Sequence, residues 1–212
     1  MIPRRLVRVV PEHTGEEAER YWRMAMALHP DWEFVTWRDP IDPAAFPLTS
    51  PYWGQCSSGA QLADLVRTED IYTRGGIYLD SDVEVLRSFE PLLGVEAFAA
   101  WEDDEVVCNA VFGARPQHPA LRRVLDLAVA RRHEGTWGAG VGTFTEVLRG
   151  RRDVLLLPPG ALYPYHYRQR RGLSPFWGGT EQARALLYQQ SPWAFCAHHW
   201  RGSWVEEEAV NR

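Results

Sequence analysis

Two aspartates separated by one residue, Asp80 and Asp82, are the side chains whose types and spacing point most directly to chemistry. They follow a short β-prone run at residues 77–79. Alternation along an extended chain would send both carboxylates to one side, roughly 6.5–7 Å apart at the Cα atoms. Two ionised carboxylates that close repel, so they need a cation, a proton or strong donors nearby. A Mg²⁺ or Mn²⁺ ion shared with phosphate oxygens would meet that need, and a solvated Asp-Ser-Asp turn is the alternative.

The segment before this pair contains the element that must position it. Ser58 is a good helix N-cap, and the apolar periodicity predicts a helix over residues 61–73. Two glycines at residues 75–76 would end this helix and lead directly into the strand before the aspartates. Asp64 and Arg67 are three residues apart, so they are neighbours on the helix surface. Alone, such a pair is often a surface ion pair worth about a few tenths of a kcal/mol.

The ordered run over residues 63–83, which ends in Gly-Gly-Ile-Tyr-Leu-Asp-Ser-Asp-Val, strongly resembles the sugar-binding DXD region of glycosyltransferase family 32. That family includes mannosyltransferases and bacterial capsule transferases, with clostridial glucosylating toxins as distant relatives. The resemblance implies that Asp64 and Arg67 hold hydroxyls of a donor sugar. It also implies that Asp80 and Asp82 engage the ribose and the metal-bound diphosphate.

A second motif lies near the C-terminus, where residues 198–204 read His-His-Trp-Arg-Gly-Ser-Trp. It resembles the closing His-His-Trp-x-Gly-Ser-Trp motif of the same family. The resemblance implies that His199 is a metal ligand and that Gly202 lets the backbone approach the diphosphate. Ser203 and Trp204 would complete the metal shell and cover the leaving phosphate. An imidazole among oxygen ligands suits Mn²⁺ better than Mg²⁺, and a role for the first histidine of the motif stays open.

The rest of the chain is similar to the family with lower specificity. Asn109 begins an Asn-Ala-Val-Phe-Gly-Ala run that resembles the strand whose asparagine faces the sugar. Val10 stands where the first strand of the family usually ends in a tryptophan that stacks on the base, which leaves the choice between uridine and guanosine donors open. Val141 replaces a usual proline near the acceptor side, so the acceptor is left open as well.

Strands alternate with helices along the chain, which predicts an α/β fold with a mostly parallel sheet and a ligand site beyond the C-terminal ends of its strands. The resemblance implies a single GT-A-type nucleotide-sugar-binding domain over residues 1–204, followed by a flexible tail at 205–212. We also expect a Pro-rich loop at 39–55, a Gly-rich loop after the third helix and a C-terminal part that consists mostly of loops. Strands are expected at residues 6–10, 32–37, 77–79, 98–101, 110–114 and 154–157, and helices at 16–28, 61–73 and 119–132.

Composition is that of an ordinary globular protein of 212 residues, with 45% hydrophobic and 24% charged residues. A net charge of −5 gives no sign of a nucleic-acid footprint, although all 23 basic residues are arginine. The three cysteines are widely spaced, which favours a reduced compartment. No apolar run predicts a signal peptide or a membrane span. We therefore expect a cytoplasmic protein without a transmembrane segment, and a peripheral position at the membrane stays open.

The resemblance implies a metal-dependent, retaining glycosyltransferase that moves a hexose from a UDP- or GDP-linked donor to a glycan or small-molecule acceptor. Asp64, Arg67 and Asn109 would act at the sugar, and Mn²⁺ or Mg²⁺ would be held near the diphosphate. Two alternatives remain. One is a nucleotide-sugar hydrolase in which water replaces the acceptor, and the other is a carbohydrate- or nucleotide-binding protein that holds the metal without turnover.

Overall fold

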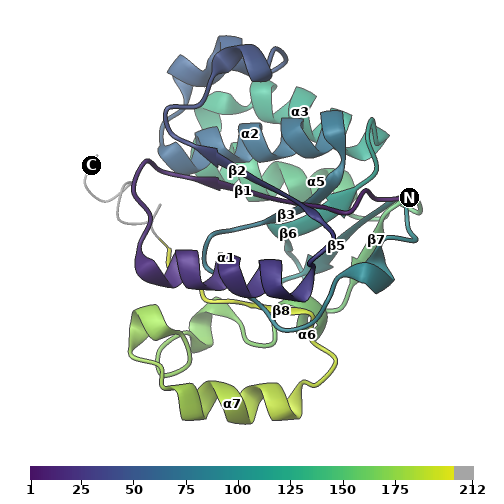
Figure 1. Cartoon of the computed structure of the whole chain (residues 1–212). Coiled ribbons are helices and arrows are strands. Elements are labelled where there is room, and N and C mark those ends of the chain that lie inside the picture. Colours follow the sequence, from purple (N-terminus) through teal and green to yellow (C-terminus); the bar gives the residue numbers. More distant parts are fainter. Residues whose placement is uncertain (203–212) are drawn as a thin grey trace.

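A six-stranded sheet forms the centre of the molecule (Figure 1), and the computed structural model describes residues 1–202 of the chain. Its strands lie in the order β2-β1-β3-β6-β5-β7. Strand β6 runs antiparallel to both of its neighbours, whereas the β1–β2, β1–β3 and β5–β7 pairs are parallel. The expectation of an α/β fold with a mostly parallel sheet is therefore confirmed. The strands are β1 (Arg5–Val10), β2 (Glu33–Arg38), β3 (Gly76–Leu79), β5 (Ala97–Trp101), β6 (Val107–Ala114) and β7 (Leu155–Leu157).

Helices cover both faces of this sheet. Helix α1 (Glu16–Leu28) lies on one side, and α2 (Gly59–Arg74), α3 (Pro119–Ala130) and α5 (Thr143–Leu148) lie on the other (Figure 1). A two-stranded antiparallel ribbon of β4 (Val83–Val85) and β8 (Cys196–His198) lies on the α1 side. In Figure 1, β8 runs between α1 and α7 (Glu181–Gln190), which lies farther from the sheet. The short helices α4 (Gly135–Trp137) and α6 (Pro159–Leu162) complete the structure.

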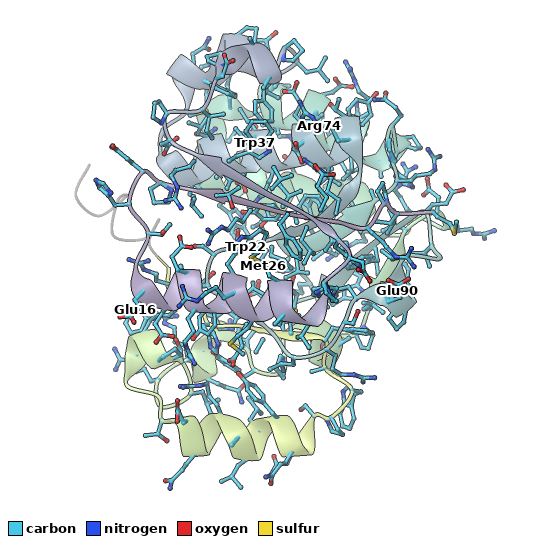
Figure 2. All side chains as sticks on the ribbon, in the orientation of Figure 1. Glu16, Trp22, Met26, Trp37, Arg74 and Glu90 are labelled. Carbon is cyan, nitrogen blue, oxygen red and sulfur yellow. The ribbon has the colours of Figure 1, made fainter. Side chains whose placement is uncertain are left out.

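Strand alternation gives each face its own core. Leu6 and Ile77 belong to the apolar cluster under α1, whereas the next residues along, Val7 and Tyr78, belong to the cluster under α2 and α3. Trp22, labelled in Figure 2, lies on the side of α1 that faces the sheet, and its ring centroid is 5.8 Å from that of Phe34 in an edge arrangement. Strand β3 is buried throughout and β1 at all positions but one, because both faces of the sheet are covered there.

Helix α2 begins and ends close to the residues that the sequence indicated. The side chain of Ser58 accepts a hydrogen bond from the backbone N–H of Gln61 (3.1 Å), as a helix N-cap should. Gly75 follows the helix with φ of 74°, and a Cβ atom there would lie 2.7 Å from Cδ of Pro116. Glycine is therefore required where the chain turns from α2 into β3.

Two expectations about loops are wrong. The Gly-rich stretch after α3 is helical, with α4, a π-helical turn at Gly138–Gly142 and α5 in succession. Its glycines allow close packing, since a Cβ atom at Gly140 would lie 2.2 Å from Oδ2 of Asp64. The C-terminal part contains α6, α7 and β8, and α7 escaped notice because its polar sequence has little apolar periodicity. The tail expected at residues 205–212 lies outside the described residues.

Candidate active site

The aspartate pair lies in a tight turn at the C-terminal end of β3. The backbone N–H of Asp80 donates to the carbonyl oxygen of Ala110 on β6 (2.8 Å), which fixes the end of the strand. The N–H of Val83 then donates to the carbonyl oxygen of Asp80 (3.1 Å), which closes the turn that carries Asp82. The two carboxylates are therefore brought together by a turn and not by alternation along an extended strand, as the sequence argument supposed.

His198 completes this group from the other end of the chain. The register of the β4–β8 ribbon pairs Val83 with His198, which places the imidazole beside the turn. His198 Nε2 lies 3.1 Å from Asp82 Oδ1. One ligand atom from each of Asp80, Asp82 and His198 lies within 4.8 Å of the others. The first histidine of the C-terminal motif, whose role the sequence left open, is thus the one that meets the aspartates.

His199, the metal ligand that the family resemblance implied, does not lie with them. Its side chain is fully buried, with Nε2 3.0 Å from Glu84 Oε2 and Nδ1 2.7 Å from the hydroxyl of Tyr165. Its ring also stacks on Tyr21 at 4.9 Å between centroids. Both ring nitrogens of His199 therefore have protein partners in this structure, and His198 is the histidine that lies with the aspartates. Neighbouring residues of a strand point to opposite faces, which explains why only one of the two histidines reaches the aspartates.

The charges of the group depend on one another. Burial raises the pKa of Asp80, and the neighbouring charge of Asp82 adds to this effect. Burial also acts to raise the pKa of Asp82, but His198 and the N–H of Arg201 outweigh it and lower the value to about 2. Burial acts to lower the pKa of His198, but the charge of Asp82 raises it well above its ordinary value. The His198 imidazole beside Asp82 and the Arg67 guanidinium beside Asp80 are the groups that can offset the charge of the two carboxylates.

A second network adjoins the aspartates on the side of α2. Arg67 donates from Nη1 to Asp80 Oδ1 (2.6 Å) and from Nη2 to Asp64 Oδ1. Asn109 donates from Nδ2 to the same oxygen of Asp64 (3.0 Å). Asp64 and Arg67 are each 7% exposed, so they are not the solvated surface pair of the alternative interpretation. The hydroxyl of Tyr78 donates to Asp80 Oδ1 (2.7 Å) and ties this network to the end of β3.

Tyr78 was missed by the sequence argument, although a signal for it existed. Residues i and i+2 of a strand share one face, so alternation places Tyr78 and Asp80 on the same side. Arg67 lies over the ring of Tyr78, with Cζ 4.8 Å from the centroid. The Nε atom of Arg67 is buried and has no hydrogen-bond partner among residues 1–202. A donor of this kind is available to a hydroxyl or phosphate oxygen of a ligand.

The remaining predicted residues are placed as follows. Gly202 adopts a positive φ of 69°, and the N–H of the preceding residue, Arg201, donates to Asp82 Oδ2 (2.8 Å). The backbone before Gly202 therefore reaches the aspartates. Ser203 and Trp204 lie outside the described residues.

Val10 is buried at the end of β1, so it offers no exposed face on which a nucleotide base could stack.

The donor set fits a divalent cation. An octahedral ion with ligands at about 2.1 Å requires neighbouring ligand atoms roughly 3 Å apart and opposite ones roughly 4.2 Å apart. His198 Nε2 and Asp82 Oδ1, at 3.1 Å, have the spacing of neighbouring ligands, and the ligand atoms of the whole group lie within 4.8 Å of one another. Two carboxylates with one imidazole suit Mn²⁺ and also admit Mg²⁺. His198 Nδ1 is buried without a geometrically well-formed hydrogen bond among the described residues, and the ring packs on Trp200 at 4.0 Å between centroids.

Comparisons with known proteins match part of the chain to a family of sugar transferases. Residues 15–99 match the family described as glycosyltransferase sugar-binding region containing DXD motif. The chain is 33% identical over 102 residues to inositol phosphoceramide mannosyltransferase 3 of Schizosaccharomyces pombe, which covers 46% of this chain and 29% of that protein. It is 27% identical over 146 residues to human alpha-1,4-N-acetylglucosaminyltransferase, covering 62% of this chain and 42% of that protein. The matched part thus spans less than half the length of either relative.

Solved structures share the fold. The PaToxG glycosyltransferase superposes with a TM-score of 0.59 at 17% identity, covering 69% of each chain. The galactosyltransferase LgtC, solved with donor and acceptor sugar analogues, superposes with a TM-score of 0.53 at 14% identity, covering 92% of this chain and 87% of that one. The expected GT-A glycosyltransferase fold is therefore confirmed. None of the helices within residues 1–202 is both long enough and apolar enough to cross a membrane.

Proposed function

Since this chain belongs to the glycosyltransferases whose sugar-binding region contains a DXD motif, we propose that it transfers a hexose from a nucleotide-sugar donor to a hydroxyl group of an acceptor, in a reaction that needs a divalent cation. The observation that carries this proposal is the meeting of two groups at the C-terminal edge of the sheet. One is the Asp80, Asp82 and His198 set, and the other is the Asp64–Arg67 network beside it.

The residues of the first group would hold the cation. When bound, Mn²⁺ or Mg²⁺ would neutralise the charge that grows on the departing nucleoside diphosphate. Asp80 and Asp82 supply oxygen ligands, and His198 supplies a nitrogen ligand once it has lost its proton. The N–H of Arg201 already points into this group, at 2.8 Å from Asp82 Oδ2. Gly202, the next residue, has no side chain, so a diphosphate could approach the backbone closely there.

The residues of the second group would orient the donor sugar. Asp64 offers carboxylate oxygens to sugar hydroxyls, and Arg67 offers the buried Nε donor described above. Asn109 holds Asp64 in place through its amide (3.0 Å). Gly140 leaves the space over Asp64 Oδ2 that any side chain would fill. Rigid donors and acceptors of this kind contribute to catalysis by holding the reacting carbon in one orientation.

In this proposal the transferred sugar is a hexose or a hexose derivative. The curated relatives include a mannosyltransferase and an N-acetylglucosaminyltransferase by name, which supports GDP-mannose and UDP-N-acetylglucosamine as the first donors to test. We also propose retention of anomeric configuration, following the family resemblance of the DXD region. The anomeric proton coupling of the isolated product tests this part separately.

A donor screen tests the proposal. The protein with Mn²⁺ is incubated with each donor, with and without sugar acceptors, and nucleoside diphosphate release and product mass are measured. We expect turnover of at least one donor and a loss of about 100-fold in Asp64→Asn, because the sugar loses its orienting carboxylate. The matched control is Asp126→Asn on α3, where an exposed aspartate pairs with Arg122 at 3.0 Å and should leave turnover unchanged. No release of nucleoside diphosphate from any donor would contradict the proposal.

A further inference from the structure

Glu102 lies at the same edge of the sheet as the proposed donor site. It follows the C-terminal end of β5, and β5 runs in the same direction as β3 because both are antiparallel to β6. Asp80 follows β3, and only β6 lies between the two strands. On β6 the backbone partners of Asp80 and Glu102 are Ala110 and Val106, which are four residues apart, so the two backbones are separated by roughly 16 Å across and along the sheet. Glu102 thus lies at the same edge, on the side away from β1, and the charge of His198 acts on its carboxylate.

Of the two neighbouring acidic residues in this loop, Asp103 binds backbone N–H groups of the loop and Glu102 does not. Asp103 Oδ1 accepts the backbone N–H groups of Glu105 and Val106, each at 2.9 Å. The side chain of Glu102 is only 10% exposed, yet it accepts no hydrogen bond from an N–H or O–H group of residues 1–202. Its neighbour Cys108 has a thiol, which is a weak donor. Burial raises the pKa of Glu102 accordingly.

His166 has a ring nitrogen, Nε2, that lies beside Glu102 and makes no hydrogen bond within the described residues. Its Nδ1 accepts the backbone N–H of Arg168 (3.2 Å), so in the neutral ring the proton is on Nε2. This Nε2 lies 3.4 Å from Glu102 Oε1 and 3.6 Å from Asp103 Oδ2, and it makes no hydrogen bond within the described residues. A buried donor without a hydrogen-bond partner among the described residues therefore lies beside a carboxylate that has only the weak thiol donor of Cys108. Such groups are costly unless a ligand or water satisfies them.

The ring of Trp200 connects this place to the metal group. Its centroid is 4.0 Å from that of His198 and 6.3 Å from that of His166. Trp200 also has a positive φ of 51°, which is unfavourable for a bulky residue and is retained mainly where the surroundings impose it. The unfavourable backbone conformation therefore occurs at Trp200, whose ring lies next to the rings of both His198 and His166.

The geometry points to a subsite for a neutral, polyhydroxylated acceptor at Glu102 and His166, in which one acceptor hydroxyl donates to the Glu102 carboxylate and accepts from His166 Nε2. This inference rests on the glycosyltransfer proposed above and names the acceptor class for that reaction. A hydroxyl is both a donor and an acceptor, so it can satisfy both groups at once. The carboxylates of Glu102 and Asp103 repel a phosphate group, and the charge of Arg168, which acts on both, offsets only part of that repulsion, so a neutral sugar or cyclitol ring fits better.

The test compares transfer with hydrolysis of the donor. Wild-type protein and Glu102→Gln are assayed with a nucleotide-sugar that the enzyme turns over, with water alone, with methyl α-mannopyranoside or myo-inositol as neutral probes, and with mannose 6-phosphate as an anionic probe. Glu102→Gln keeps the shape but loses the charged acceptor. We expect the ratio of transfer to hydrolysis to fall about ten- to a hundredfold, with a larger effect on acceptor KM than on kcat.

A matched control is available two residues away. Asp104→Asn removes an exposed carboxylate from the same loop and should leave both transfer and hydrolysis unchanged. His166→Gln should lower the same ratio, and thermal unfolding of each variant checks that it is folded. An unchanged ratio in Glu102→Gln would overturn the subsite, as would hydrolysis by wild type without transfer to either neutral probe, or transfer to mannose 6-phosphate alone. Wild type that releases no nucleoside diphosphate at all would instead contradict the glycosyltransfer itself.

Discussion

Asp82 Oδ1 and His198 Nε2 lie 3.1 Å apart, although the two residues are separated by more than half of the chain. The β4–β8 ribbon creates this contact, because it pairs Val83 with His198. His199, one residue farther, turns to the other side and joins Glu84 and Tyr165 in the core. The two adjacent histidines therefore have separable roles, which two variants distinguish.

His198→Asn should weaken metal binding. It removes the nitrogen ligand from the Asp80 and Asp82 pair, and we expect the Mn²⁺ dissociation constant to rise by at least about tenfold. Calorimetric titration of the metal-free protein measures this without any assay of activity. His133→Asn, at an exposed histidine before α4, is the control and should bind Mn²⁺ like wild type. Unchanged Mn²⁺ affinity in His198→Asn would remove this residue from the metal site.

His199→Ala should act on stability instead. The side chain is fully buried, and its loss leaves a cavity and deprives Glu84 and Tyr165 of hydrogen-bond partners. We expect the free energy of unfolding to fall by about 1–3 kcal/mol, as measured by denaturant titration in chelator. A variant as stable as wild type with much weaker Mn²⁺ binding would return the ligand role to His199.

The sequence predicted the elements on either side of the turn well, because the signals for them are local. The cap at Ser58, the stop at Gly75 and the strand before Asp80 all depend on residues close to one another in the chain. The choice between His198 and His199 does not depend on such local signals. It depends on the register between β4 and β8, and a slip by one residue would exchange the two side chains.

Glu102 was not identified from the sequence for a similar reason. It begins an acidic run of four residues at 102–105, and such a run usually indicates a solvated loop. Only the fold shows that one carboxylate of the run is turned inward next to His166. The helices α5 and α7 were also missed, since the glycines before α5 and the polar residues of α7 obscure their periodicity.

Arg67→Lys should damage turnover despite the retained charge. The planar guanidinium contacts Asp64 and Asp80 at once, which an ammonium group cannot reproduce in the same geometry. We expect kcat to fall by about 100-fold. The control is Arg20→Lys on α1, where an i,i+3 pair with Glu17 at 2.9 Å is solvent-exposed and should tolerate the change. Wild-type kinetics in Arg67→Lys would show that this network does not orient the sugar.

Acid stability should depend on Glu19. Hydrogen bonds from Thr14 and Arg8, followed by Arg38, lower its pKa from 4.5 to about 2. A depressed carboxyl pKa gives stability that is complete above about pH 4.5 and is lost as the pH falls toward 2. Glu19→Gln should therefore cost about 1–2 kcal/mol at pH 7, allowing for partial exposure, and the difference from wild type should shrink in acid.

Unfolding by urea at several pH values measures this difference. Glu16→Gln serves as the control, because Glu16 is exposed at the start of the same helix (Figure 2) and should change stability little at any pH. A constant difference between Glu19→Gln and wild type from pH 7 to pH 2 would show that the Glu19 contacts do not contribute in this way.

The most direct test of the central claim is donor turnover as a function of divalent cation. The protein is stripped of metal with a chelator, and nucleoside diphosphate release from the nucleotide-sugar donor is followed while Mn²⁺ or Mg²⁺ is added back. Because Asp80, Asp82 and His198 form a mixed oxygen and nitrogen donor set, turnover should be absent in chelator and restored by Mn²⁺ at least as well as by Mg²⁺. Full turnover in excess chelator would contradict the account.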